Sequence, residues 1–268
     1  MTPAPSAQII WLSDPHYAVD GLVQGHNPRK RLDAAIDHIN THYAGADLCI
    51  ISGDMVETAT VADYQGVRAR LKQLAMPWHP MTGNHDRRAL FLAHMPLPDT
   101  VMPGFAQYVI ELPTVRLICL DTLWEGQDAG LLCADRLAWL QDQLKIADAR
   151  PVIVFAHHPP VALGLPMLDM DRLSNGADML DILARHPNVR QLCCGHVHRP
   201  VSGVIGSMGL ACLRATLYQA PPPAPAWDWA SFKPAAEAPQ LGIITIEDDR
   251  IILRYEEFCS ASYGVVPG

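Results

Sequence analysis

The stretch TGNHD, Thr82 to Asp86, follows a short apolar run and precedes a helix-like segment. Its glycine, carboxamide, imidazole and carboxylate are poor material for a hydrophobic core. Neutral imidazole, carboxylate oxygen and carboxamide oxygen are the donor types that borderline divalent metals accept. The stretch therefore predicts a turn that can hold a metal rather than a core segment.

Other apolar runs in the chain end in the same way. Five strand-like runs each deliver a metal-capable side chain just past their carboxyl ends, which is the edge where open α/β sheets bind ligands. The clusters are DPH (14–16), GD (53–54), GNHD (83–86), HH (157–158) and GHVH (195–198). The donors are too many for one tetrahedral zinc and fit two metals about 3.5–4 Å apart that share a carboxylate. Glycines at 53, 83 and 195 let the backbone turn sharply.

Strand-like and helix-like segments alternate along most of the chain. The pattern predicts strands at 8–13, 47–52, 78–82, 151–158 and 189–196, and helices at 28–43, 61–75, 87–95, 134–147 and 176–186. Strands without intervening helices are expected at 107–112 and 115–121, joined by a tight turn at 113–114, and at 200–206, 210–218, 240–247 and 250–258, the last two joined by a hairpin at 248–249. Central strands covered on both faces, in one mixed sheet or two packed sheets, give an α/β fold.

Composition limits the classes of function. The chain has 268 residues, of which 49% are hydrophobic, and a net charge of −8. A chain with this net negative charge is not expected to carry a broad basic surface for binding long nucleic acids. The chain contains no run of 18 apolar residues, so no membrane span is predicted. The first residues carry no signal-peptide pattern, so we expect a cytoplasmic protein. The seven cysteines include no CxxC pair and are expected to be reduced, mostly buried thiols.

The predicted organisation has three parts. Residues 1–218 form the catalytic core, 219–240 a proline-rich loop or lid, and 241–268 strands that complete the sheet and offer an oligomer contact. The segment APPPAPAWDWASFKPAAEAP (220–239) contains six prolines and excludes regular structure. Two interpretations remain open for it: a surface connector, or a lid or homo-oligomer contact that carries Trp227, Trp229 and Phe232.

In this order, DPH, GD, GNHD, HHPP and GHVH resemble the calcineurin-like metallophosphoesterase superfamily, over roughly residues 8 to 218. Within it the chain most resembles the class III phosphodiesterases, which are bacterial glycerophosphodiesterases and cyclic-nucleotide phosphodiesterases. The resemblance implies a four-layer α/β/β/α sandwich, also classed as α+β, with two mixed sheets between helices. It places a dinuclear metal site at the C-terminal edge of the strands.

The resemblance also implies roles for individual residues. One metal would be held by Asp14, His16, Asp54 and His198, and the other by Asp54, Asn84, His157 and His196, with Asp54 bridging. The implied metals are Fe, Mn, Zn or Co, often as mixed pairs. His85 would be the catalytic group over the phosphate. The candidates for substrate contacts are Asn84, His85, Tyr218 and Tyr17. Tyr218 departs from the branch, which commonly has histidine there, and tyrosine is the weaker acid near neutral pH.

Two neighbours of these residues have more than one interpretation. Asp86 either bonds back into its own loop or caps the following helix, or does both. His158 either reaches metal or substrate or is only the neighbour of a ligand.

The predicted function is hydrolysis of small phosphodiesters, with broad glycerophosphodiester-like specificity, by metal-activated water. His85 would stabilise charge on the phosphate or protonate the leaving group. A 3',5'-cyclic nucleotide phosphodiesterase is the alternative, and the sequence reveals no purine-stacking pocket that would decide. A non-catalytic scaffold would be expected to have lost ligands, whereas all seven positions are filled here. The expected partner is the small phosphodiester itself, with neither a membrane nor a long nucleic acid.

Overall fold

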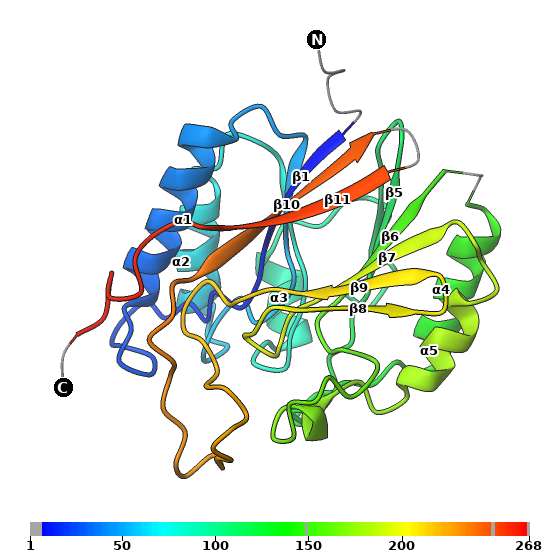
Figure 1. The fold of residues 1–268 in the computed structure, drawn as a ribbon. Helices are drawn as coiled ribbons and strands as arrows, with labels where there is room; N and C mark the ends of the chain where they lie inside the picture. The colour runs from blue at the N-terminus through cyan, green and yellow to red at the C-terminus, as the bar shows by residue number, and fades with distance from the viewer. Residues whose placement is uncertain (1–6, 148–149, 248–249, 267–268) are drawn as a thin grey trace.

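The computed structural model describes residues 7–147, 150–247 and 250–266 (Figure 1). Its strands are β1 (Ala7–Leu12), β2 (Leu48–Ile51), β3 (Trp78–Pro80), β4 (Tyr108–Glu111), β5 (Arg116–Cys119), β6 (Val152–Ala156), β7 (Val189–Cys194), β8 (Val201–Ile205), β9 (Met208–Cys212), β10 (Gln240–Glu247) and β11 (Arg250–Glu257). Its helices are α1 (Pro28–His42), α2 (Val61–Leu71), α3 (Arg88–His94), α4 (Ala134–Lys145) and α5 (Gly176–Leu183), with a 3-10 turn, η1 (Asp169–Asp171).

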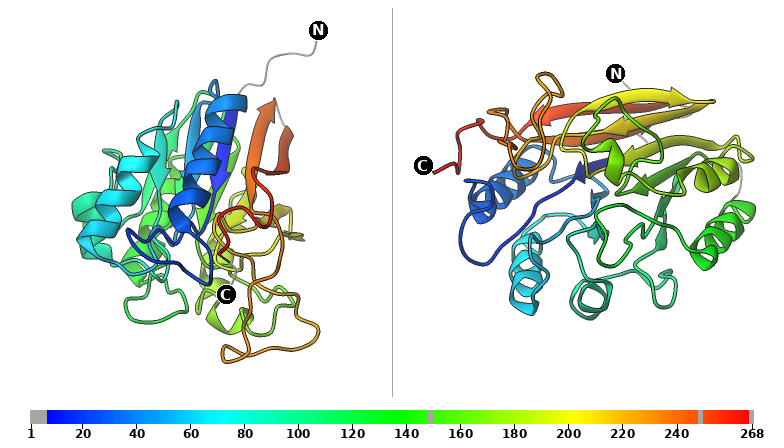
Figure 2. Two further views of the ribbon diagram at one scale, coloured as in Figure 1. Left: turned by 90° about the vertical axis from the view of Figure 1, so that its left-hand side faces the viewer. Right: turned by 90° about the horizontal axis from the view of Figure 1, so that it is seen from below.

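The strands form two mixed sheets, as the family resemblance implied; the residue pattern alone had left one sheet or two open. One sheet has the order β11-β10-β1-β2-β3, and the other the order β4-β5-β6-β7-β9-β8. In the first sheet β1, β2 and β3 are parallel, while β10 is antiparallel to both β1 and β11. In the second, β5, β6, β7 and β9 are parallel. Helices α1 and α2 lie on one side of the paired sheets, and α4 and α5 on the other (Figures 1 and 2). The predicted sandwich of two mixed sheets between helices is confirmed.

Both faces of the central strands are buried. In β1, Ile10 and Leu12 pack into the core under α1 and α2, whereas Ile9 and Trp11 pack into the core between the sheets. In β6 the residues likewise alternate between the core under α4 and α5 and the core between the sheets. Alternate side chains of these strands enter different hydrophobic cores. Because both faces are buried, the strands are continuous apolar runs in the sequence.

Local sequence signals fix where helix α1 begins. Asn27 caps it by accepting a hydrogen bond from the backbone N–H of Lys30 at 3.1 Å, and Pro28 occupies the first turn. The apolar residues that follow at helical spacing, Leu32, Ile36 and Ile39, are buried against β1 and β2. The predicted helix at 28–43 therefore matches the observed one within a residue.

The expected strand at 210–218 is shorter than predicted. β9 ends at Cys212, because the following residues turn toward the ends of β1 and β2. Gln219 closes this turn with its side-chain amide, which bonds both the N–H and the C=O of Ala215, and the N–H of Thr216 bonds the C=O of Ser13 at 2.8 Å. The turn η1 was not predicted, and the hairpin expected at 248–249 lies outside the described residues.

The seven cysteines are free, and five of them are buried, as expected. No helix in the described ranges is long and apolar enough to cross a membrane.

Replacing Phe155 by alanine tests the packing between the sheets. Phe155 of β6 is fully buried and meets Trp11 of β1 edge to face, with 6.0 Å between ring centroids. The Phe155→Ala substitution should lower the free energy of unfolding in urea by about 3–5 kcal/mol. Val204→Ala, at a side chain 73% exposed on β8, should change it by less than about 0.5 kcal/mol. Equal effects of the two substitutions would contradict this account of the core.

Candidate active site

The predicted ligands meet at the carboxyl ends of strands from both sheets. Asp14 and His16 follow β1, and Asp54 follows β2. Their ligand atoms and that of His198, which follows β7, all lie within 4.8 Å of one another. The Nε2 atoms of His16 and His198 are 3.1 Å apart. Asp54 Oδ2 lies 3.5 Å from His16 Nε2, and Asp14 Oδ1 lies 3.4 Å from His198 Nε2.

A second group lies on the other side of Asp54. Asn84 follows β3, and its Oδ1 is 3.2 Å from His157 Nε2 and 3.0 Å from His196 Nδ1. Asp54 Oδ2 is 3.3 Å from His157 Nε2. The structure thus brings together all seven predicted ligands, in two groups with Asp54 between them.

The backbone is strained where it presents these side chains. The non-glycine residues with positive φ in the described ranges are Asp14, His16, Gln24, Asp54, His196 and His198. Five of these six are predicted ligands. Left-handed backbone costs such residues about 1–2 kcal/mol each, and strain of this kind concentrates at functional sites. The turns therefore hold these residues in a left-handed backbone conformation that they would not adopt by intrinsic preference.

Glycines make room for the ligands. A Cβ atom at Gly53, which has φ +104°, would collide with the ring of His157. A Cβ at Gly83 would collide with the carboxylate of Asp54, and one at Gly195 with the hydroxyl of Ser13. The glycines of the motifs are thus needed for close approach as much as for their turns.

Hydrogen bonds decide which ring nitrogens are free. The Nδ1 of His157 lies 2.8 Å from the C=O of Ser52, and the Nδ1 of His198 lies 2.8 Å from the C=O of Tyr218. The Nδ1 of His16 lies 2.8 Å from the carboxylate of Glu57. These oxygens only accept, so each Nδ1 carries the proton. When the rings are neutral, as metal binding requires, the three Nε2 atoms therefore present lone pairs toward the carboxylates of Asp14 and Asp54.

This arrangement fits a pair of metal cations. Lone pairs and carboxylates that face one another in a buried site are unfavourable without positive charge between them. The Nε2 of His196 is buried and has no hydrogen-bond partner. Metal-bound histidines typically donate their other N–H to a carbonyl or carboxylate, as three of these do. The nitrogen and oxygen donors match Fe, Mn, Zn or Co better than Ca or Mg.

The pKa values of the predicted histidine ligands reflect their burial close to one another and to the carboxylates. Burial lowers the pKa of His157, but the charges of Asp54 and Asp14 and the hydrogen bonds to Asp54 and Ser52 together outweigh it and raise the pKa to about 9. Burial, with the charge of His157, lowers the pKa of His196 to about 3. The pKa values of two rings with centroids 5.2 Å apart are therefore shifted in opposite directions. Both rings feel the charges of Asp54 and Asp14, but only His157 pairs directly with Asp54, at 3.3 Å from its Nε2.

His85 stands beside the first group. Its ring packs edge to face against His16, with centroids 4.6 Å apart, and its Nδ1 donates to the C=O of Glu57 at 3.0 Å. The Nε2 atom is therefore the nitrogen available to a bound molecule. Glu57 was missed by the sequence reasoning, although it also holds His16, because no strand end or motif marks it.

The two neighbours left open by the sequence are resolved by their contacts. Asp86 accepts hydrogen bonds from the N–H groups of Gly83 and Met55 at 2.9 and 3.1 Å, so it bonds back into its own loop. It does not cap helix α3, which has Arg87 at the cap position. His158 is buried with both nitrogens engaged, at 2.7 Å from Thr122 Oγ1 and 3.0 Å from the C=O of Asp128. It therefore has no lone pair to offer a metal.

The two predicted tyrosine contacts differ. Tyr218 lies over the site, with its ring centroid 5.3 Å from that of His16 and 4.6 Å from that of His198. Tyr17 instead is 3% exposed in the core under α1 and α2, where its ring packs against Gly66 and Arg70. It does not line the cavity and therefore has no place among the substrate contacts.

A cavity of about 280 Å³ opens over the site. Its walls include His16, Asp54, Asn84, His85, His196, His198 and Tyr218, together with Gln24, Glu57, Asp128, Leu168, Asp171, Ala220, Trp229 and Phe232. Of the second set, Trp229 and Phe232 were expected only under the interpretation of their loop as a lid, and the others were not predicted as site residues. These residues come from loops, whose position depends on tertiary contacts rather than on a local pattern.

Comparison with known families agrees with this geometry. A family model described as calcineurin-like phosphoesterase matches residues 7–200. The chain belongs to the calcineurin-like phosphoesterase family. It is therefore a metal-dependent phosphoesterase with a dimetal site, for which the histidine and aspartate groups above are the candidates. The predicted family and enzyme class are confirmed.

Similar members of the calcineurin-like phosphoesterase family carry two kinds of name. The chain is 32% identical to a probable cyclic nucleotide phosphodiesterase of Rhodopseudomonas palustris, over 96% of this chain and 93% of the relative. It is 34% identical to the glycerophosphodiester phosphodiesterase GpdQ of Enterobacter lignolyticus, over 65% and 64% of the two chains. A dimetal phosphatase from Danio rerio shares the fold at 15% identity, with a TM-score of 0.71 over 96% of this chain and 98% of that one.

Adding a methyl group at Gly53 tests the close approach of His157. The Gly53→Ala variant should lose at least one of two bound metal ions, because the new Cβ displaces the ring. Gly21→Ala is the matched control: Gly21 also has positive φ (+72°), but a Cβ there meets no atom within 4 Å. Both variants carry backbone strain, so only the metal content, measured by plasma mass spectrometry, separates them. Full metal content in Gly53→Ala would contradict this geometry.

Proposed function

We propose that this protein hydrolyses small phosphodiesters, and that Asp14, His16, Asp54 and His198 hold one metal while Asp54, Asn84, His157 and His196 hold the other. The observation that carries the proposal is the convergence of Nε2 lone pairs and carboxylates at one end of the cavity. Relatives named as phosphodiesterases support the reaction class. Bound cations would offset phosphate charge and make water a stronger nucleophile near neutral pH.

The residues of the chain supply positioning and proton transfer. With Nδ1 bonded to the C=O of Glu57, protonated His85 donates from Nε2 to a phosphoryl oxygen or to the leaving oxygen. Burial, together with the charges of Glu57 and Asp54, raises the pKa of Tyr218 well above its usual value. The hydroxyl of Tyr218 therefore stays protonated and serves as a hydrogen-bond donor.

The charge around the cavity favours a diester over a monoester. Glu57, Asp128 and Asp171 line it, and the lining residues include no lysine or arginine. A phosphodiester carries one negative charge, whereas a monoester carries up to two at neutral pH. The additional charge would meet these carboxylates without a matching cation from the chain.

Two substrate classes fit, and we propose the glycerophosphodiester-like one with broad specificity. A 3',5'-cyclic nucleotide is the second candidate. It is favoured by the relative that aligns over nearly the whole chain and by Trp229 and Phe232, which line the cavity and offer faces for a base.

Further expectations from the sequence remain part of the proposal. The division into 1–218, 219–240 and 241–268 is supported by the aromatic residues that the middle segment adds to the cavity wall and by the pairing of β10 with β1. We also retain a cytoplasmic location and an oligomer contact that involves the C-terminal strands.

An activity panel tests the function. Bis(p-nitrophenyl) phosphate, a glycerophosphodiester, cyclic AMP and p-nitrophenyl phosphate are compared by kcat/KM with Fe, Mn, Zn or Co added. We expect the diesters to exceed the monoester, and chelator treatment to abolish turnover until metal is restored. Full activity after chelation, or a preference for the monoester, would refute the proposal. The ratio of glycerophosphodiester to cyclic AMP turnover chooses between the two substrate classes.

The His85→Asn variant tests the proton donor. It should lower kcat about 10²- to 10⁴-fold and leave two metal ions bound, because His85 holds no metal in this assignment. His94→Asn is the control, since His94 lies at the end of α3 and does not line the cavity. If His85→Asn lost metal together with activity, His85 would be structural instead.

A further inference from the structure

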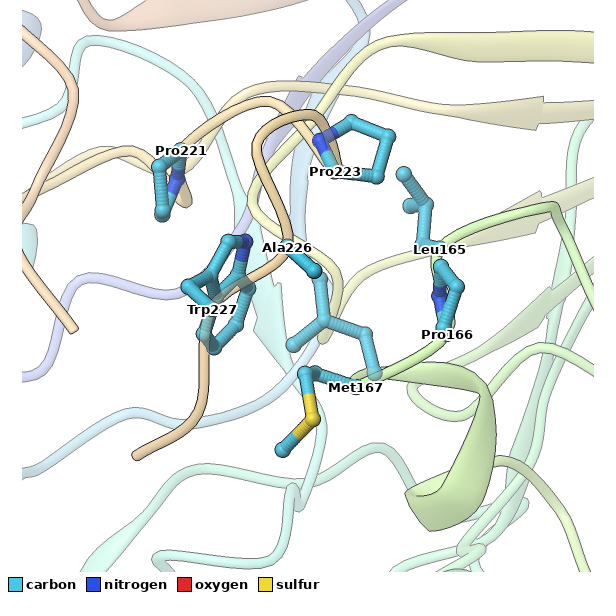
Figure 3. A pocket seen from close by; sticks show the side chains of 8 residues that line it. Leu165, Pro166, Met167, Pro221, Pro223, Ala226 and Trp227 are labelled. Atoms are coloured by element: carbon cyan, nitrogen blue, oxygen red, sulfur yellow. The ribbon is translucent and has the colours of Figure 1, made fainter. Parts of the chain in front are cut away.

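A second, apolar hollow shares the wall residue Leu168 with the catalytic cavity. Figure 3 shows the side chains that line this hollow. The hollow has a volume of about 120 Å³ and lies between two loops. One loop contributes Leu165, Pro166, Met167 and Leu168, and the proline-rich loop contributes Pro221, Pro223, Ala226 and Trp227. None of these side chains carries a charge. An apolar cavity of about 150 Å³ in another protein binds benzene, so this hollow suits a short alkyl chain or a single aromatic ring.

The hollow and the catalytic cavity are neighbours. Leu168 lines both of them, and the neighbours Ala220 and Pro221 line one each. The ring of Trp227, in the hollow, lies 5.4 Å from the rings of both Trp229 and Phe232, which line the catalytic cavity.

Aromatic rings also lie between the hollow and the predicted metal ligands. The Phe232 ring lies 6.0 Å from Tyr218, whose ring lies 4.6 Å from His198. An unbroken series of rings therefore leads from a predicted metal ligand into the hollow.

Both walls are held in place by hydrogen bonds. The carboxylate of Asp169 accepts from three consecutive N–H groups, those of Leu163, Gly164 and Leu165, at 2.7, 3.1 and 2.9 Å. At the other wall, the guanidinium of Arg199 donates to the C=O of Ala220 at 2.5 Å and pairs with Glu237 at 3.2 Å. Such preformed walls lower the entropy cost of binding an apolar group.

We propose that this hollow binds the uncharged alkyl or aryl arm of a phosphodiester whose phosphate lies at the metal ligands. The inference rests on the proposed function and narrows its substrate class to diesters with one apolar arm. Charge supports this occupant over a second phosphate, because Asp128 and Asp171 line the cavity that leads into the hollow. The wall residue Leu168, shared with the catalytic cavity, supports it over a separate ligand.

Binding of non-hydrolysable analogues tests the inference without turnover. Dimethylphosphinate and its methyl(butyl), methyl(octyl) and methyl(decyl) relatives are monoanions with no ester bond to cleave. Calorimetry with the metal-loaded protein should show Kd falling about fourfold for each methylene that is buried in the hollow. The longest arms, which can extend past Tyr218 and Phe232 to the hollow, should then bind roughly tens of times more tightly than the dimethyl analogue. Kd values that do not depend on arm length would overturn the inference.

Two alanines in the proline-rich loop give a matched pair of variants. Ala226 lines the hollow, and Ala226→Leu should fill it and remove most of the gain from a longer arm, while the Kd of dimethylphosphinate stays unchanged. Ala230 is exposed in the same loop and lines neither cavity, so Ala230→Leu should preserve the full dependence on length. Trp227→Ala opens one wall and should also flatten the dependence. Trp139→Ala, on α4 and outside both cavities, controls for loss of an indole.

The outcomes separate this inference from the function on which it rests. If the metal-loaded protein binds no phosphinate, the proposed function fails and the inference fails with it. If dimethylphosphinate binds but longer arms give no gain, only the inference fails. If Ala226→Leu instead disrupts self-association in sedimentation experiments and phosphinate binding is independent of arm length, the hollow is a contact between copies of this chain.

Discussion

The site depends on how three imidazole rings are held. The rings of His16, His157 and His198 each donate Nδ1–H to a fixed oxygen, which points the Nε2 lone pairs toward Asp14 and Asp54. Burying lone pairs and carboxylates next to one another does not by itself stabilise the folded protein. It becomes favourable only around cations, so folding assembles a binding site whose electrostatic cost is relieved by the metals. The left-handed turns and the glycines that crowd the ligands serve this same arrangement.

The packing between the sheets is part of the same arrangement. The first sheet supplies the ligands that follow β1, β2 and β3, and the second supplies those that follow β6 and β7, so neither sheet holds a complete set. A polar seam joins the core to the site. The Trp11 indole donates to Ser52 Oγ at 2.8 Å, Ser52 Oγ lies 2.7 Å from Ser13 Oγ, and Ser13 bonds Asp14. Each ligand group draws residues from both sheets, so a shift of one sheet on the other would pull apart the ligands within each group.

The sequence was most informative where chemistry and periodicity coincide. Apolar strands that end in Asp, Asn or His located the seven side chains that the structure brings together, because the ends of parallel strands share one edge. It was least informative for residues that reach the site from loops. Glu57 and Asp171 follow no pattern, and their positions depend on contacts made by distant segments. Tyr17 shows the limit most clearly: it follows His16 directly, but the strained turn directs its ring into the core instead of the cavity.

The proline-rich loop is anchored outside the metal site. Its ends are held by the bridge between Gln219 and Ala235 and by the pairing of Glu237 with Arg199 and Arg214, none of which is a predicted ligand. Under the role proposed for the hollow, replacements at Pro221, Pro223 or Ala226 would change which arm is bound and leave Tyr218 and the predicted ligands in place. In evolutionary terms, selectivity could then drift separately from catalytic power.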